Sequence, residues 1–324
     1  FGTTRFGAVS RRRAVEVRLR AMLAATMPLG PHDGVLLVAH GTVSDLDDLP
    51  AFLAQIRRGR PAPPALVAEL RHRYQTIGGS PLLDITRAQA TALSKRLDAP
   101  VLVGMRLWRP TVEDVLRGIA GLKLRRLCVL PLAPFSVHVY LSAAQESFAA
   151  MRQELGPLAP ELVPTEPWGT EPAFVEGLAE SIRARLSDNG KTTSVVLTAH
   201  SLPTRAIREG DPYEAQFRAC ATAVSERLGR RCAVAFQSQG ADGGDWLGPD
   251  LKSVLEGERA AGSERVVLAP IGFPAEHVET LYDLDVEAAG WARELGLELS
   301  RVRALDDDPR LIDALESVVR RAFG

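Results

Sequence analysis

The chain has 324 residues, of which 46% are hydrophobic and 24% are charged, and its formal net charge is −1. Such a chain can bury a full core and is long enough for two domains of ordinary size. Because no basic surplus is present, nucleic acid is not expected as a partner, and small-molecule chemistry becomes the default. No run approaches the roughly 18 apolar residues of a membrane helix, so no membrane span is expected.

Three cysteines, Cys128, Cys220 and Cys232, lie far apart without a CxxC pair. This spacing predicts free thiols in a reducing cytoplasm. An iron–sulfur cluster needs four ligands, so three cysteines of one chain do not predict one. Near the start, six arginines stand against the single acid Glu16. We expect residues 1–30 to form a loosely ordered N-terminal extension.

From Gly34 onward, short β-branched runs alternate with helical patterns, which is typical of βαβ units and a parallel sheet. The expected strands are 35–39, 100–104, 127–132, 194–199, 233–238 and 266–271. The expected helices are 65–74, 81–97, 112–119, 143–155, 171–186, 213–228 and 279–295. The sequence therefore predicts an α/β fold of two Rossmann-like halves, each a doubly wound parallel sheet.

A Pro-rich stretch at 156–167 is the expected boundary between the halves. It assigns 31–155 to the N-terminal half and 156–306 to the C-terminal half, and leaves 307–324 as a final helix that packs back on the core. No glycine-rich phosphate loop follows a strand, which argues against nucleotide binding. Ligands of open α/β sheets bind at the carboxyl ends of strands, and three segments with reactive side chains lie there.

The first two segments carry imidazole and carboxylate groups. The strand 194–199 runs into His200, which is either structural or functional. Glu279, Asp283 and Glu287 are spaced four apart, so on a helix they form one stripe whose mutual repulsion needs a compensating cation. The stripe is either a solvated acidic face or a metal path. Imidazole with carboxylates suits Fe²⁺.

The third segment places Trp246 beside Gly and Pro. Its ring either forms the floor of a pocket for a flat aromatic ligand or packs over the hydrophobic core. Another cluster stands near the N-terminus. The run 56–60 (IRRGR) holds three guanidinium groups that suit bidentate capture of carboxylates, although such clusters are often only solvated.

Read together, these segments resemble the ferrochelatase family in order and in spacing. The C-terminal motifs are AHSLP at 199–203, GDPY at 210–213, FQS at 236–238, WLGP at 246–249, PIGF at 270–273 and HVETLYD at 277–283. The N-terminal motifs are GT at 41–42, IRRGR at 56–60 and YQTIGGSP at 74–81. The resemblance covers the chain from about Gly34 to the C-terminus, and the ordered set is far more specific than any one motif.

The resemblance implies a chelatase-like fold with a porphyrin cleft between the halves, and an enzyme that inserts Fe²⁺ into a porphyrin in haem biosynthesis. The short stretch between His40 and Arg57 and the Arg-Arg-Gly-Arg run look like the soluble coproporphyrin-type enzymes, which favours coproporphyrin III over protoporphyrin IX. Porphyrin and ferrous iron are then substrates, no prosthetic group is expected, and a monomer is favoured. A delivery partner in the haem pathway is left open.

By position, the resemblance makes His200 and Glu279 the catalytic pair and metal ligands, and Asp283 and Glu287 the line that conducts iron toward them. The expected porphyrin contacts are Ile56, Phe135 and Trp246 as walls, and Arg57, Arg58, Ser80 and Ser136 as polar contacts. His40 stands where coproporphyrin-type relatives usually carry Tyr. We expect it to contact the porphyrin and to ligate the iron of the product, the alternative being a strand-end hydrogen bond.

Two other functions remain open at this level. The His40-Gly41-Thr42 segment also resembles the sirohydrochlorin cobalt and iron chelatases. A non-catalytic haem carrier is the alternative from another class, although a carrier needs no acid–base pair such as His200 and Glu279.

Overall fold

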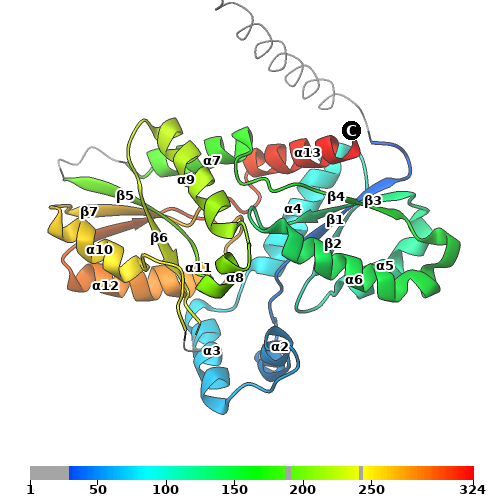
Figure 1. Cartoon of the computed structure of the whole chain (residues 1–324), viewed down its shortest axis with the longest axis horizontal. Coiled ribbons are helices and arrows are strands. Elements are labelled where there is room, and N and C mark those ends of the chain that lie inside the picture. Colours follow the sequence, from blue (N-terminus) through cyan, green and yellow to red (C-terminus); the bar gives the residue numbers. More distant parts are fainter. Residues whose placement is uncertain (1–28, 187–190, 241–243) are drawn as a thin grey trace, which may run out of the picture.

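The structure is a computed structural model that describes residues 29–186, 191–240 and 244–324. The extension expected over residues 1–30 therefore lies outside the described residues, apart from its last two positions. Two sheets stand side by side, one from each half of the chain (Figure 1).

The first sheet is parallel and has the strand order β2-β1-β3-β4. Its strands are β1 (Asp33–Ala39), β2 (Val101–Met105), β3 (Arg126–Pro131) and β4 (Glu161–Pro164). All seven residues of β1 are buried, as expected for an apolar strand covered on both faces. Because β4 pairs with β3, the first sheet continues past residue 155, and the expected boundary at 156 is wrong for this strand.

The second sheet repeats the same arrangement with the order β6-β5-β7-β8, again all parallel. Its strands are β5 (Thr193–His200), β6 (Ala233–Gln237), β7 (Arg265–Ala269) and β8 (Glu298–Arg301). The expected α/β fold of two parallel sheets is confirmed. Only β4 and β8 are absent from the expected strands. Each has four residues at a sheet edge and contains no fully buried residue, so its sequence lacks the apolar run of a central strand.

Helices cover both faces of each sheet. They are α2 (Leu49–Ile56), α3 (Pro64–Ile77), α4 (Leu82–Leu97), α5 (Val112–Gly118), α6 (Val137–Leu155), α7 (Pro172–Arg183), α8 (Thr204–Arg208), α9 (Tyr213–Leu228), α10 (Leu251–Ala260), α11 (Val278–Tyr282), α12 (Ala289–Glu294) and α13 (Pro309–Phe323). The helix expected over 279–295 is α11 and α12 with a π-helix, η4 (Asp283–Ala288), between them. The helix expected from 143 begins six residues earlier, at Val137.

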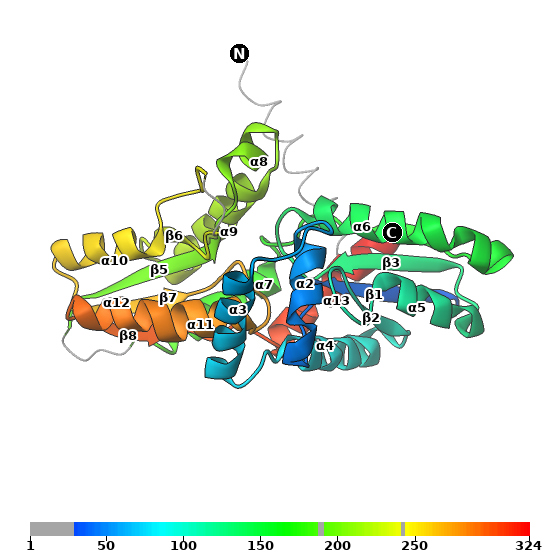
Figure 2. The same ribbon diagram turned by 90° about the horizontal axis from the view of Figure 1, so that it is seen from below.

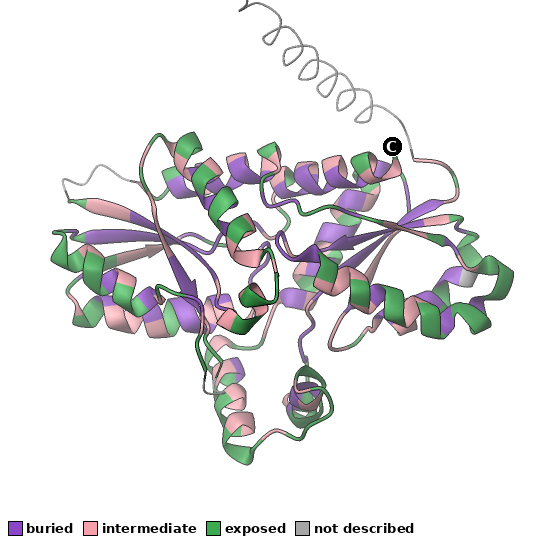
Figure 3. Ribbon diagram, viewed as in Figure 1, coloured by how far each residue is buried: buried purple, intermediate pink, exposed green. Residues whose placement is uncertain are grey.

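The two halves share one core. The C-terminal helix α13 packs against α7 and α4, and buries Leu311, Leu315 and Val318 completely or nearly so (Figure 1). One apolar cluster continues from the first sheet through these helices to the second. Burial is therefore concentrated in the strands of both sheets and along the inner faces of α7 and α13 (Figure 3). Among the described residues, no helix combines the length and apolarity needed to cross a membrane.

On the opposite side from α13, helices α2 and α3 project as a separate pair (Figure 1). A small apolar cluster holds them, built on Val43, Leu49, Phe52 and Tyr74. Helix α3 belongs to the N-terminal half, yet it packs beside α11 of the C-terminal half (Figure 2). This contact brings side chains of α3 next to the acidic stripe.

Candidate active site

Two cavities of about 490 and 430 Å³ open between the halves, and they share the same inner wall. The residues that line both cavities are His40, Leu82, His200, His277 and Glu279. Together the cavities have the size of a site for a large planar ligand. Three imidazoles and one carboxylate at their junction mark it as the chemical centre.

The topology explains why these side chains meet. His40 directly follows β1, His200 is the last residue of β5, and the loop after β7 carries His277 into α11. The carboxyl ends of parallel strands lie at one edge of a sheet, and here the edges of the two sheets face each other. Two glycines allow close passage. A Cβ on Gly41, whose φ is +111°, would lie 2.9 Å from the Trp108 nitrogen, and one on Gly272 would lie 2.6 Å from the Ala199 Cβ.

Glu279 stands between two imidazoles. Its Oε1 lies 3.6 Å from His200 Nε2, and its Oε2 lies 3.4 Å from His277 Nε2. Burial alone would raise the pKa of Glu279, but His200 and His277 hold that pKa well below its usual range. Burial alone would lower the pKa of His200, but Glu279 outweighs it and raises that pKa. Each partner thus favours the charged form of the other, and the two groups titrate as a coupled unit.

His40 differs from His200 in the direction of its pKa shift. Burial lowers the pKa of His40 to about 4, so its imidazole is neutral at physiological pH. It lines both cavities and no side-chain hydrogen bond restrains it in the described structure. The strand-end hydrogen bond considered as an alternative is therefore absent for this side chain among the described contacts, and the ring can accept a ligand bond.

A buried ionic network supports the loop that carries His277 and Glu279. Glu276 is completely buried and accepts a 2.6 Å hydrogen bond from Thr280 Oγ1 and another of 2.6 Å from Arg301 Nη1. Arg301 also makes a bidentate pair with Asp285 in the π-helix, with distances of 2.5 and 2.8 Å. The one guanidinium thus fixes the loop before α11 to the helix after it.

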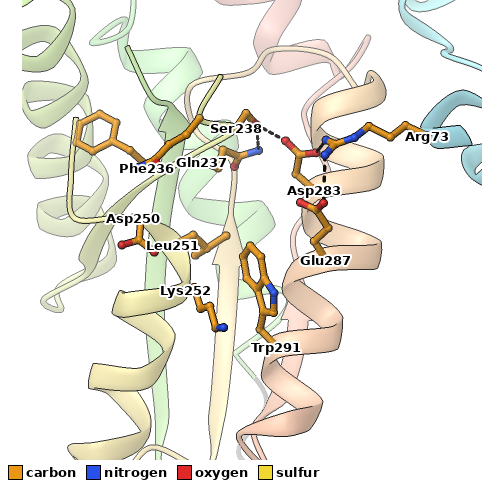
Figure 4. A pocket seen from close by; sticks show the side chains of 11 residues that line it. Arg73, Phe236, Gln237, Ser238, Asp250, Leu251, Lys252, Asp283, Glu287 and Trp291 are labelled. Atoms are coloured by element: carbon orange, nitrogen blue, oxygen red, sulfur yellow. Dashed lines mark hydrogen bonds and ion pairs between the residues drawn. The ribbon is translucent and has the colours of Figure 1, made fainter. Parts of the chain in front are cut away.

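The acidic stripe continues from Glu279 into η4, as the spacing predicted, but a cation already occupies it. Arg73 from α3 donates to Asp283 Oδ1 at 2.7 Å and to Glu287 Oε1 at 3.2 Å (Figure 4). The hydroxyl of Ser238 donates to the other oxygen of Asp283. Burial, with Glu279 and Glu287 nearby, raises the pKa of Asp283 to about 6. Within the described residues, His, Cys, Asp and Glu side chains do not form a ready three-ligand metal cluster.

The expected porphyrin contacts all line one of the two cavities. Ile56, Arg57, Ser80 and Trp246 line the smaller one, and Arg58, Phe135 and Ser136 line the larger. The Ser80 hydroxyl oxygen is buried and has no hydrogen-bond partner among the described residues. Such an orphan group at a cavity wall is suited to a polar substituent of a ligand.

Two expected contacts have additional roles in the structure. Phe135 is only 2% exposed and packs edge-on against Tyr213 and Phe217, with ring centroids 5.8 and 6.0 Å away. It therefore acts mainly as a packing residue that holds the wall of the larger cavity in place. The Ser136 hydroxyl donates to Asp211, and Gln216 accepts from its backbone N–H at 2.8 Å. These hydrogen bonds tie the N-terminal half to the C-terminal half beside the larger cavity.

Several lining residues were not among the expected site residues. They are Arg73, Arg106, Tyr140, Tyr213 and His277. Tyr213 and His277 belong to motifs at 210–213 and 277–283, so the motif positions alone pointed to them. Arg106 lies over the Tyr140 ring, 5.4 Å from its centroid, and only the fold brings that pair to the cavity.

The sequence matches a known protein family over most of its length. The family model described as Ferrochelatase matches residues 32–323. A ferrochelatase of Deinococcus radiodurans is 35% identical over 302 residues, which cover 89% of this chain and 95% of that relative. The chain belongs to the ferrochelatase family. A coproporphyrin III ferrochelatase of Geobacillus thermodenitrificans is 33% identical over 302 residues, 88% of this chain and 94% of the relative.

The ferrochelatase family is an enzyme family, and its fold extends to more distant chelatases. SirB from Bacillus subtilis, solved with Fe³⁺, superposes with a TM-score of 0.59 at 14% identity, covering 90% of this chain and 95% of SirB. At that identity the likeness shows the fold alone.

Proposed function

We propose that this chain inserts Fe²⁺ into coproporphyrin III, in preference to protoporphyrin IX, as a step of haem biosynthesis. The observation that carries the proposal is the His200–Glu279 pair, 3.6 Å apart, on the wall common to two cavities. A ring that spans both cavities would present its centre to this pair.

The reaction replaces two pyrrole N–H protons by one metal ion, so it needs a proton acceptor and a group that strips water from the ion. His200 and Glu279 supply both, since a divalent cation that reaches the carboxylate competes with the imidazolium for it. The displaced imidazolium then releases its proton to solvent water, and the neutral His200 imidazole accepts the two pyrrole protons one after the other and passes each to solvent. The Glu276–Arg301 network keeps the carboxylate in position.

The preference for coproporphyrin rests on the polar edge of the smaller cavity. Arg57, Arg60 and Ser80 line it, and Arg58 lines the neighbouring one. Coproporphyrin has four carboxylates and protoporphyrin has two, so a rim of guanidinium groups favours the former. Relatives of similar identity carry both names, ferrochelatase and coproporphyrin III ferrochelatase.

For His40 we propose a role in the product complex. A neutral imidazole at the cavity junction can bind the ferrous iron of the haem, and it does so better than an un-ionised phenol. The expected consequence is slower release of haem than from relatives with Tyr at this position.

We also propose that the enzyme acts as a cytoplasmic monomer without a prosthetic group. The three cysteines are free, with Cys128 and Cys220 buried, which fits a reducing compartment. Iron is a substrate in this scheme and not a resident cofactor.

The test is a metallation assay under anaerobic conditions with Fe²⁺ and, separately, coproporphyrin III, protoporphyrin IX and sirohydrochlorin. The proposal expects the highest kcat/KM for coproporphyrin III. Preference for protoporphyrin IX would overturn the substrate assignment, and preference for sirohydrochlorin would favour the chelatase alternative. Tight haem binding without metallation of any of the three would favour the carrier.

A further inference from the structure

Arg73 lines two neighbouring cavities. It lines the smaller of the two cavities at the active site, and it also lines an outer cavity of about 170 Å³ formed by α10, η4 and the loop after β6 (Figure 4). Asp283 is the other charged residue with this double position, whereas Glu287 faces only the outer cavity. Arg73 and Asp283 are thus the charged side chains where the outer cavity and the smaller active-site cavity adjoin.

In the described structure, Arg73 binds carboxylate oxygens of the acidic stripe that a metal ion would need as ligands. Both oxygens of Asp283 accept hydrogen bonds, one from Arg73 and one from Ser238, and one oxygen of Glu287 accepts from Arg73. The Asp283 side chain is 5% exposed, so solvent screens this pair weakly. The guanidinium therefore takes the place that a metal ion would need.

Arg73 also has partners that keep it in place when the stripe releases it. Its Nε donates to Glu69 Oε1, 2.9 Å away and one turn back on α3, and its Cζ lies 4.7 Å from the centre of the Tyr282 ring. A divalent cation that binds Asp283 and Glu287 would therefore displace the guanidinium from these two carboxylates, while Glu69 and the Tyr282 ring still hold the Arg73 side chain nearby.

We propose that Arg73 is an internal counter-ion that closes the acidic stripe until a divalent cation displaces it. The inference rests on the proposed function, because it assumes that iron enters along Asp283 and Glu287. Arg73 acts on the metal through these carboxylates, so it is a positioning residue. It makes metal entry a competition, and only a cation that binds carboxylates strongly enough to displace the guanidinium passes.

The direct test measures cation binding without porphyrin. Titration calorimetry with Co²⁺ compares the wild type, Arg73→Gln and the matched control Arg71→Gln. Arg71 lies two residues away on the same helix, and its ion pair is with Asp47 at 3.2 Å, away from the stripe. Loss of a competing charge-assisted contact should tighten Co²⁺ binding about tenfold or more in Arg73→Gln. Equal affinity in all three proteins would overturn the proposal.

A kinetic readout separates the competition from a purely structural role. With saturating porphyrin, Arg73→Gln should lower KM for the metal about tenfold while kcat changes little, and Arg73→Lys, which keeps the charge, should return KM toward the wild-type value. A fall in kcat with unchanged KM for the metal, in a folded variant of normal melting temperature, would overturn it.

A third protein distinguishes failure of this inference from failure of the proposed function. Asp283→Asn combined with Glu287→Gln should weaken Co²⁺ binding and remove the effect of Arg73→Gln. If that double variant binds Co²⁺ and metallates porphyrin like the wild type, iron does not use the stripe and the inference is wrong, while the ferrochelatase activity itself stands. If the wild type metallates no porphyrin at all, the proposed function fails first.

Discussion

Replacing Arg57 and Arg58 together by Ala tests how the enzyme selects its porphyrin. Both side chains line the cavities, but they differ in exposure. Arg57 is half-buried and its Nε atom is shielded from solvent, whereas Arg58 is exposed and adopts a φ of +56°. The two contributions to porphyrin binding should therefore be unequal.

The magnitude follows from that difference. A shielded charge-assisted contact contributes about 1.5–3 kcal/mol, and an exposed ion pair contributes about 0–1 kcal/mol. We take about 2 kcal/mol for the pair with coproporphyrin III, which is roughly thirtyfold in affinity. Protoporphyrin IX, with half the carboxylates, should lose about half that free energy, or roughly fivefold. Selectivity should therefore fall about fivefold.

The assay is KM and Kd for each porphyrin, from metallation kinetics and from quenching of porphyrin fluorescence. Arg117→Ala, an exposed arginine of α5 that lines neither active-site cavity, is the matched control. Equal losses for both porphyrins would refute the reasoning, because the arginines would then not read the number of carboxylates. A loss in the Arg117 variant would point to general surface charge instead.

Three further predictions concern single residues. His200→Ala should lower kcat by about 10²–10⁴-fold while porphyrin binding survives, and activity within a factor of a few of wild type would remove His200 from the mechanism. The haem complex should show nitrogenous axial ligation that is lost in His40→Ala and becomes phenolate-like in His40→Tyr, and identical spectra for all three proteins would contradict this. Asp33→Asn should lower the free energy of unfolding by about 1 kcal/mol at pH 7, because Asp33 accepts bonds of 2.8 and 2.6 Å from the half-exposed Arg126. Burial would raise the pKa of Asp33, but Arg126 and the Gly30 N–H lower that pKa on balance. The stabilisation by Asp33 is therefore present above the pKa of about 3.9 in the unfolded chain, and it is lost as the pH falls through the lower pKa of the folded protein. Urea unfolding at pH 7 and pH 3 checks it, and an equal difference between the two proteins at both pH values would be the contrary result.

The class of fold, and the strand ends at which the candidate site lies, can be predicted from the sequence alone. Buried parallel strands are continuous apolar runs, so β1, β3, β5 and β7 stand out, and His40 and His200 are found by their place at strand ends. The ordered motifs indicated the family. The edge strands β4 and β8 were missed because a half-exposed edge leaves little hydrophobic pattern, and this misplaced the boundary at residue 156.

The cation that neutralises the acidic stripe could not be predicted from the sequence. The four-residue spacing showed that Glu279, Asp283 and Glu287 need a cation, yet nothing local to them supplies one. Arg73 lies 210 residues from Asp283 in the chain and reaches it because α3 packs against α11 across the two halves. The same holds for Arg301, which joins Glu276 to Asp285 from an edge strand. Sequence periodicity reports which face of an element is buried, but the partner that meets that face is set by how distant elements pack.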